Sequence, residues 1–230
     1  LMRTGAEGND LPYDMSRYGG SADENYLELN KDEKELLAEV HKSFDKVIVL
    51  ISSANAMQMD FVDKAEYGID AVLWYARPAG GIGSIAKILS GAINPSGRLV
   101  DTYCYDNTTS PAVQNAYVTS YTNAAEKGLA FAKTNNEYYV VYQEGIYIGY
   151  RYYETRYEDA VLGNANVGDY DYAKTVAFPF GYGLNYSNLS YGKLNMKENG
   201  DTFDFTVDVT NPSDRDAREA VLIYMQSPYT

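Results

Sequence analysis

One carboxylate of this chain, Glu7, lies between small residues. Residues 5–11 read GAEGNDL, so small residues flank the glutamate and Asp10 follows three positions later. Glycine lets a loop approach a substrate closely, and a carboxyl whose pKa is raised can protonate a leaving group. The alternative is that Glu7 is one of many solvated carboxylates on an acidic chain. Taken alone, residues 5–11 favour that alternative, so the other motifs must decide between the two.

A second pattern in the sequence is typical of dinucleotide-binding proteins. Residues 81–86 read GIGSIA, which satisfies the dinucleotide pattern G-x-G-x-x-A, and Asp101 lies twenty positions after Gly81. However, residues 76–80 separate this pattern from the preceding apolar run, whereas the dinucleotide turn is tight. Glycines at the start of a helix also have purely structural uses. We therefore expect a structural role for Gly81 and Gly83, with dinucleotide binding kept as a rival hypothesis.

The cysteine and histidine of this chain do not form a second candidate catalytic site. Cys104 is the single cysteine, which excludes an internal disulfide, and only His41 is present to activate it as a nucleophile. We expect Cys104 to be a small residue in or near a strand end and His41 to lie at the surface or at a helix end. No His, Cys or carboxylate cluster has the spacing of metal ligands, so neither a metal nor another cofactor is expected.

Composition excludes several classes of partner. The chain has 230 residues, of which 45% are hydrophobic and 22% charged, so a folded core is expected. Its 32 acidic residues outnumber 19 basic ones, for a formal net charge of -13 that would repel nucleic acid and anionic membranes. The longest apolar stretch, residues 47–51, is far shorter than the roughly 20 residues needed to cross a bilayer. Binding to nucleic acid and insertion into a membrane are therefore not expected.

Residues 30–52 predict one helix followed by one strand. Asn30 and Glu33 form a capping-box pattern. The apolar residues that recur after it at helical spacing are Leu36, Leu37, Val40 and Phe44. Residues 46–52 are apolar and β-branched without polar alternation, which predicts a strand buried on both faces, as in parallel sheets.

The same alternation continues downstream. Residues 60–67 fit a weaker helix, and residues 71–75 fit a second buried strand. A third helix is expected from Ile82 until Gly91 ends it, followed by a short third strand over residues 98–103. Helices that alternate with buried strands indicate the α/β class, as a layered sandwich with a mostly parallel sheet.

The second half of the chain changes character twice. Residues 106–136 are rich in Asn, Thr, Ser and Ala, and we expect a long surface insertion there. Residues 202–209 alternate apolar and polar side chains, which is typical of antiparallel strands with one wet face, and residues 220–225 are expected to form another strand. A closed sandwich needs about seven strands, so this second domain is expected to be cut off at Thr230.

Four stretches of the chain together resemble glycoside hydrolase family 3. They are RTGAEGND at residues 3–10, NPSGRL at residues 94–99, YQEGIYIGYRYY at residues 142–153 and FPFGYGL at residues 178–184. Two departures from the family pattern occur. Ala79 and Gly80 stand where the family usually has Gly-Gln, and Leu11 replaces the final Arg of the segment around Glu7, with an insertion over residues 12–25 after it. The resemblance extends over almost the whole chain.

The resemblance implies a role for Glu7. In many members of this family a Ser-Gly-Glu-Gly-x-Asp-Arg segment supplies the general acid/base, which implies that Glu7 is the proton donor of a retaining glycosidase. Retention requires a second carboxyl about 5–5.5 Å away that attacks the anomeric carbon. In the family this nucleophile is an Asp on a (β/α)8 barrel, for which this chain has too few strand–helix units. The nucleophile is therefore expected outside the chain, and the isolated segment is expected to be inactive.

Other residues follow from the same resemblance. Asp10, Tyr13 and Tyr18 lie beside Glu7 in the sequence and are candidates for binding the substrate, and Tyr26 is a further candidate for the leaving-group subsite. The tyrosines expected to serve mainly packing are Tyr147, Tyr150, Tyr152 and Tyr153.

The resemblance also implies a domain organisation and a reaction. Residues 1–189 would form the α/β sandwich domain, truncated at its amino end, with the insertion over residues 106–136. Residues 190–230 would begin an all-β, immunoglobulin-like domain of the fibronectin type III-like kind. The implied enzyme hydrolyses terminal β-D-glycosides, first of all β-glucosides. Its partners would be a β-glucoside or oligosaccharide substrate and the missing (β/α)8 barrel domain of the same protein.

Two alternatives stay open. The first is a non-catalytic carbohydrate-binding or scaffolding relative that retains Glu7 without using it. The second is a dinucleotide-binding α/β protein. The sequence leaves open the sugar, the linkage, the domain order, the oligomeric state and the compartment, with secretion or the cell surface favoured over the cytoplasm.

Overall fold

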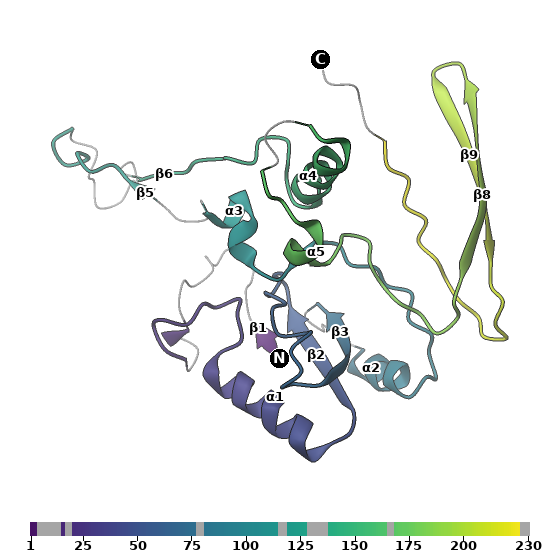
Figure 1. Ribbon diagram of the computed structural model, residues 1–230, viewed down its shortest axis with the longest axis horizontal. Helices are drawn as coiled ribbons and strands as arrows, with labels where there is room; N and C mark the ends of the chain where they lie inside the picture. Colours follow the sequence, from purple (N-terminus) through teal and green to yellow (C-terminus); the bar gives the residue numbers. More distant parts are fainter. Residues whose placement is uncertain are drawn as a thin grey trace. The chain divides into compact units, whose positions relative to one another are not determined.

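The computed structural model describes residues 1–3, 15–16, 20–76, 81–114, 119–127, 138–164 and 168–225. These residues belong to two units. Unit 1 comprises Leu1–Arg77 and Asp101–Phe180, and unit 2 comprises Pro78–Val100 and Gly181–Thr230. Figure 1 labels their helices and strands.

A three-stranded parallel sheet forms the centre of unit 1. Its strands are β1 (Met2–Arg3), β2 (Val47–Ser53) and β3 (Ile69–Tyr75), in the order β1-β2-β3. Both neighbouring pairs are parallel, as expected for strands joined through a crossover segment. The predicted α/β class with a parallel sheet is confirmed.

Helix α1 (Lys31–Ser43) connects β1 to β2 in this unit and begins where the capping box predicts (Figure 1). The Asn30 side chain accepts a hydrogen bond of 2.8 Å from the Glu33 N–H, and the Glu33 carboxylate accepts one of 3.0 Å from the Asn30 N–H. Two of the first orphan N–H groups of the helix are thereby satisfied. Leu37 is buried, whereas Leu36 and Phe44 are exposed, so the predicted apolar face is only partly covered.

The expectation that both strands are buried on both faces was wrong. In β2 the side chains of Val47, Val49 and Ile51 are buried, but Ile48 on the opposite face is 50% exposed. Strand β3 has no buried residue, and within the described part of the chain it pairs with β2 alone. An unbroken apolar run indicates that both faces are hydrophobic, but burial also needs a covering element, and the described residues leave the Ile48 face without a full cover.

The predicted helix over residues 60–67 was also wrong. This segment is a series of turns in which Val62, Lys64 and Tyr67 each donate to the carbonyl three residues earlier, at 3.0–3.3 Å. Phe61 and Tyr67 are both buried, and a spacing of six residues does not place them on one helical face. Burial of these rings therefore outweighs the local helical pattern.

A second layer of unit 1 surrounds Cys104. Strand β4 (Tyr103–Cys104) pairs with β7 (Val176–Phe178) in an antiparallel manner. The elements around them are η2 (Asn107–Thr109), α3 (Pro111–Gln114), α4 (Tyr150–Leu162) and α5 (Tyr172–Thr175). Cys104, Tyr153 and Val176 form a small buried cluster. Further along, β5 (Thr119–Ser120) and β6 (Tyr138–Tyr139) pair in an antiparallel manner within and beside the expected insertion.

The predicted third parallel strand over residues 98–103 was wrong. Of that range only Tyr103 lies in a strand, and its partner is antiparallel. Leu99 belongs to unit 2, where its N–H donates to the Tyr182 carbonyl and its carbonyl accepts from the Gly181 N–H, both at 2.8 Å. A backbone pairing with a segment about eighty residues away thus takes the place of the expected strand.

Unit 2 contains helix α2 and a long hairpin. Helix α2 (Ile82–Leu89) starts after Gly81, which has a φ of +85°, a value that favours glycine. The hairpin consists of β8 (Ser190–Asn199) and β9 (Thr202–Thr210), an antiparallel pair (Figure 1). The strand predicted over residues 202–209 is therefore confirmed as β9.

Two other expectations for unit 2 fail. Residues 220–225 contain no strand, so the prediction there was wrong. Strand β8 was not predicted, because its residues lack a regular alternation of apolar and polar side chains. Neither β8 nor β9 contains a buried residue, so the expected dry face is not covered by the described residues. That the hairpin begins a fibronectin type III-like domain stays a prediction.

Candidate active-site edge of the parallel sheet

The residues predicted to act on or bind a substrate lie outside the described part of the chain. Glu7, Asp10 and Tyr13 are among residues 4–14, and Tyr18 is among residues 17–19. Their roles therefore stay predictions. The structure does describe the strand that leads into this segment and the groups around it.

Strand β1 places the start of the Glu7 segment at one edge of the sheet. Met2 pairs with Ser52 and Arg3 with Ser53, so β1 ends beside the carboxyl end of β2. Strand β3 ends at the same edge, since Ser52 pairs with Tyr75. In open α/β sheets ligands bind outside the carboxyl ends of the strands. The segment that contains Glu7 therefore begins at the edge where this class of fold binds its ligands.

Arg3 fixes the end of β1 to the start of α1. Its guanidinium donates to both carboxylate oxygens of Glu33, at 2.7 and 2.6 Å, and to the backbone carbonyls of Tyr26 and Glu28, each at 2.5 Å. A third carbonyl, of Met2, accepts at 2.9 Å. The side chain is only 2% exposed, and a buried cation is tolerated only when it is paired and hydrogen-bonded in this way.

Glu33 serves two purposes at once. It caps α1 through the Asn30 N–H and it pairs with Arg3. Burial alone would raise the pKa of its carboxyl, but the hydrogen bonds from Arg3 and from Asn30 hold that pKa below its usual value. Glu33 is therefore ionised at neutral pH. The sequence predicted the cap but not the ion pair, because Arg3 and Glu33 are thirty positions apart in the chain.

The carboxyl end of β2 is held by polar contacts. The Ser53 hydroxyl donates to the Asn55 carbonyl at 2.7 Å and accepts from the Asn55 N–H at 3.1 Å. The Trp74 indole donates to the Ser53 carbonyl at 3.0 Å, and its ring meets that of Tyr103 edge to face. The described residues at the strand ends, 53–55 and 75–76, include no carboxyl. Any acid at this edge must come from elsewhere, such as the segment that contains Glu7.

Three other predicted residues are described. Tyr26 is 2% exposed and its ring lies 5.8 Å from the Arg3 guanidinium, so it packs in the core and the expectation that it lines a subsite was wrong. Cys104 is buried at a strand, and burial raises the pKa of its thiol, which makes it a poor nucleophile, as predicted. His41 lies in the last turn of α1, where its ring faces Gly68, which agrees with a role at a helix end.

Two further kinds of structure are absent from the described ranges. No three His, Cys, Asp or Glu side chains there are grouped as a metal ion requires. No helix among the same residues is long and apolar enough to cross a membrane.

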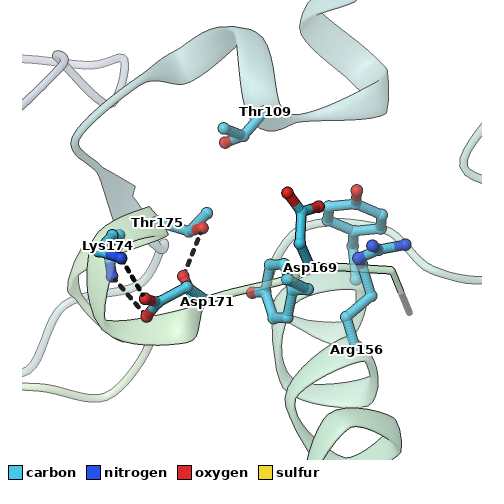
Figure 2. Close-up of a pocket in the computed structure, with 8 residues that line it drawn as sticks. Thr109, Arg156, Asp169, Asp171, Lys174 and Thr175 are labelled. Atoms are coloured by element: carbon cyan, nitrogen blue, oxygen red, sulfur yellow. Dashed lines mark hydrogen bonds and ion pairs between the residues drawn. The ribbon is translucent and has the colours of Figure 1, made fainter. Parts of the chain in front are cut away.

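Unit 1 also contains a cavity. It has a volume of about 480 Å³. Its lining consists of Thr109, Tyr152, Arg156, Asp169, Tyr170, Asp171, Lys174 and Thr175 (Figure 2). The residues that line it come from η2, α4, α5 and the segment before α5, and sequence reasoning had assigned only Tyr152 a role, in packing.

The fold thus belongs to the α/β class, with a parallel sheet in which β1 ends beside the carboxyl end of β2. The chain belongs to the family of glycosyl hydrolase family 3 C-terminal domains, since the model of that family matches residues 5–150. It is 30% identical over 237 residues to a β-glucosidase of Ruminococcus albus, which covers 99% of this chain and 21% of that protein. It is 29% identical over 204 residues to an exo-α-(1→6)-L-arabinopyranosidase of Bifidobacterium longum, with 88% of this chain and 22% of that protein covered.

Solved structures agree with this membership. A β-glucosidase from Paenibacillus barengoltzii superposes with a TM-score of 0.59 at 27% identity, over 84% of this chain and 18% of that one. β-glucosidase 3B from Thermotoga neapolitana, in complex with glucose, gives 0.56 at 28% identity, over 82% of this chain and 22% of that one. The chain therefore spans about a fifth of the length of the relatives it matches.

Proposed function

We propose that this chain is part of a retaining β-glycosidase and supplies its general acid/base, Glu7. The observation that carries the proposal is the position of the GAEG segment. It lies inside the family match, and it directly follows β1 at the carboxyl edge of a parallel sheet. The relatives named above are glycosidases, mostly β-glucosidases, which supports the same reaction class.

In this proposal Glu7 acts twice. It first protonates the oxygen of the leaving group while a second carboxylate attacks the anomeric carbon, and it then deprotonates the water that hydrolyses the glycosyl–enzyme intermediate. The second carboxylate comes from outside this chain, on the (β/α)8 barrel that the family resemblance implies. Asp10, Tyr13 and Tyr18 contact the substrate around the leaving group. The chain alone is then inactive, because it contains half of the catalytic pair.

The described residues contribute a rigid base for this segment. The ion pair between Arg3 and Glu33 holds the last residue of β1 against the first turn of α1. Arg3 is only four positions before Glu7 in the sequence. Because the Arg3 side chain is buried and hydrogen-bonded to Glu33 and to three backbone carbonyls, the segment starts from a fixed point. We place Glu7 on the α/β sandwich domain of residues 1–189, followed by the start of a fibronectin type III-like domain at residues 190–230.

The proposed substrate is a terminal β-D-glucoside. It is the substrate class named for most of the relatives, although one of them is named for an α-L-arabinopyranoside linkage. Assays should therefore include an aryl α-L-arabinopyranoside beside the aryl β-D-glucoside.

Azide rescue tests the role of Glu7. In the full-length protein, Glu7→Ala should slow hydrolysis of a β-glucoside with a poor leaving group by about 10²–10⁴-fold, because the leaving oxygen is no longer protonated. An aryl glucoside with a good leaving group needs little protonation, so its second step becomes limiting, and sodium azide should restore turnover and yield a β-glycosyl azide.

Glu35→Ala is the matched control, since Glu35 is an exposed glutamate of α1. It should behave as wild type, with no effect of azide. If Glu7→Ala also behaves as wild type, the proton donor is another residue. If the purified 230-residue chain shows turnover that depends on Glu7, the proposal that the nucleophile lies outside the chain is overturned.

A further inference from the structure

The cavity of unit 1 is built like a ligand site. Its volume of about 480 Å³ falls within the range of about 300–1,000 Å³ typical of small-molecule sites. It lies between the carboxyl end of η2, one face of α4, and the segment that enters α5 (Figure 2). All of these elements belong to unit 1.

One wall of the cavity is aromatic and planar. Tyr152 and Arg156 are four residues apart on α4 and therefore lie on the same helical face. The Arg156 guanidinium lies 5.5 Å from the centre of the Tyr152 ring and 4.9 Å from that of Tyr170. The Tyr170 hydroxyl donates to the Tyr153 carbonyl at 3.3 Å, which holds its ring in place. This wall offers apolar ring faces beside N–H donors.

The opposite wall is polar and largely self-paired. Asp171 accepts from the Lys174 N–H at 3.2 Å and pairs with the Lys174 ammonium at 2.9 Å. The Thr175 hydroxyl donates to the Asp171 carbonyl at 2.8 Å. Asp169 is different: no hydrogen bond joins it to another described residue, and its carboxylate points into the space below Thr109 (Figure 2). Asp169 is therefore a free acceptor within the described part of the cavity.

The charges of the lining determine the class of ligand. Two cations, Arg156 and Lys174, are balanced by two carboxylates, Asp169 and Asp171. An anionic ligand would meet both carboxylates and a cationic ligand both cations, so a neutral ligand suffers least. A ligand with adjacent hydroxyls would donate to Asp169 and accept from Arg156, while its C–H groups pack on the tyrosine rings.

We propose that this cavity binds a neutral saccharide unit, with Asp169 and Arg156 as the hydrogen-bonding residues and Tyr152 and Tyr170 as the apolar surface. This site is separate from the catalytic role proposed for Glu7 and does not depend on it. It gives Tyr152, which the sequence assigns to packing, a second role.

Direct binding to the purified 230-residue chain tests the proposal. Cellobiose and methyl β-D-glucopyranoside are titrated into the chain and followed by saturation-transfer NMR, with circular dichroism as the check of folding. We expect saturable binding that Asp169→Ala weakens about tenfold, because one charged hydrogen bond is lost. Arg156→Gln should weaken it as well. Asp214→Ala, an equivalent change at an exposed residue of the loop after β9, should leave the affinity unchanged.

A further variant separates this site from the catalytic one. Glu7→Ala should bind both saccharides as wild type does, whatever the azide experiment shows about catalysis. Saccharide binding that is lost in Glu7→Ala but kept in Asp169→Ala would overturn the proposal. It would also be overturned if neither saccharide binds saturably, or if inorganic phosphate or D-glucuronate binds and displaces them.

Discussion

Each unit contains an arginine–glutamate pair shielded from solvent, and the two pairs differ in how completely their hydrogen bonds are formed. In unit 1, Arg3 contacts both oxygens of Glu33 and three backbone carbonyls. In unit 2, Arg98 contacts a single oxygen of Glu219 and the Gly183 carbonyl. The other Glu219 oxygen is buried without a hydrogen-bond partner among the described residues.

The surroundings of the two glutamates explain the difference. Glu33 is the third residue of a helix, so its backbone is fixed and its carboxylate also caps that helix. Glu219 lies in an extended segment without regular structure, where Tyr191 donates to its oxygen at 2.8 Å. A buried pair stabilises little by itself, but breaking one is costly when the remaining charge cannot reach water. The comparison therefore predicts that Arg3 matters more to stability than Arg98.

The largest expected effect is that of Arg3→Leu. It removes the Arg3 donor from the Glu33 carboxylate and from three backbone carbonyls, and should lower the free energy of unfolding by about 3–5 kcal/mol. The measurement is urea unfolding of the 230-residue chain, followed by the fluorescence of Trp74, the single tryptophan, which lies in β3.

Arg98→Leu is the matched variant in unit 2, followed by circular dichroism. We expect a loss of only about 1–3 kcal/mol. The segment around Glu219 has no helical or sheet hydrogen bonds to hold it in place, so it can move and let the Glu219 carboxylate reach water once Arg98 is removed. If the two losses are equal, or if Arg98→Leu costs more, the distinction between the pairs is wrong.

The second prediction concerns pH. Since Glu33 has a pKa below its usual value of 4.5 in the folded chain, its contribution to stability is fully present above that value and is lost as the pH falls through the lower folded pKa. Glu33→Gln should cost about 2 kcal/mol at pH 7, and the difference in stability from wild type should narrow as the pH falls below 4.5. Urea unfolding at pH 7, 5, 4 and 3 measures this.

Glu35→Gln provides the control on the same helix, since its side chain is 67% exposed. Its difference from wild type should be small at every pH. A gap for Glu33→Gln that stays constant down to pH 3 would mean that the Arg3 pair does not titrate as the geometry requires.

The parts of the fold that the sequence predicted are those in which local and tertiary preferences agree. The capping box predicted the start of α1, because the N-cap Asn30 and Glu33 lie only three residues apart in the chain. The apolar run at β2 predicted a central parallel strand. The failures at residues 60–67 and 98–103 have one cause in common. Burial of Phe61 and Tyr67, and pairing of Leu99 with residues 181–182, are long-range effects that leave no periodic pattern.

The candidate sites divide in the same way. Residues 3–10 could be recognised because they form one contiguous motif. The pair of Arg3 with Glu33 joins residues thirty positions apart, and the cavity joins Thr109 to Arg156 and to residues 169–175. Only the fold brings such side chains together, so their individual types gave no sign of a shared site.

The smallest expected effect belongs to the hairpin, and it tests the contrast between the buried core of unit 1 and the exposed hairpin of unit 2. Phe203 on β9 is 50% exposed and Phe205 is 39% exposed, whereas Phe61 of unit 1 is 1% exposed. Phe203→Thr keeps a residue that favours strands and removes little buried surface, so the free energy of unfolding should change by less than about 0.5 kcal/mol. Phe61→Thr, the matched change in the core, should unfold the chain at a clearly lower urea concentration. A loss above about 1.5 kcal/mol for Phe203→Thr would contradict the exposure of this ring and would mean that the apolar side of β9 is covered in solution.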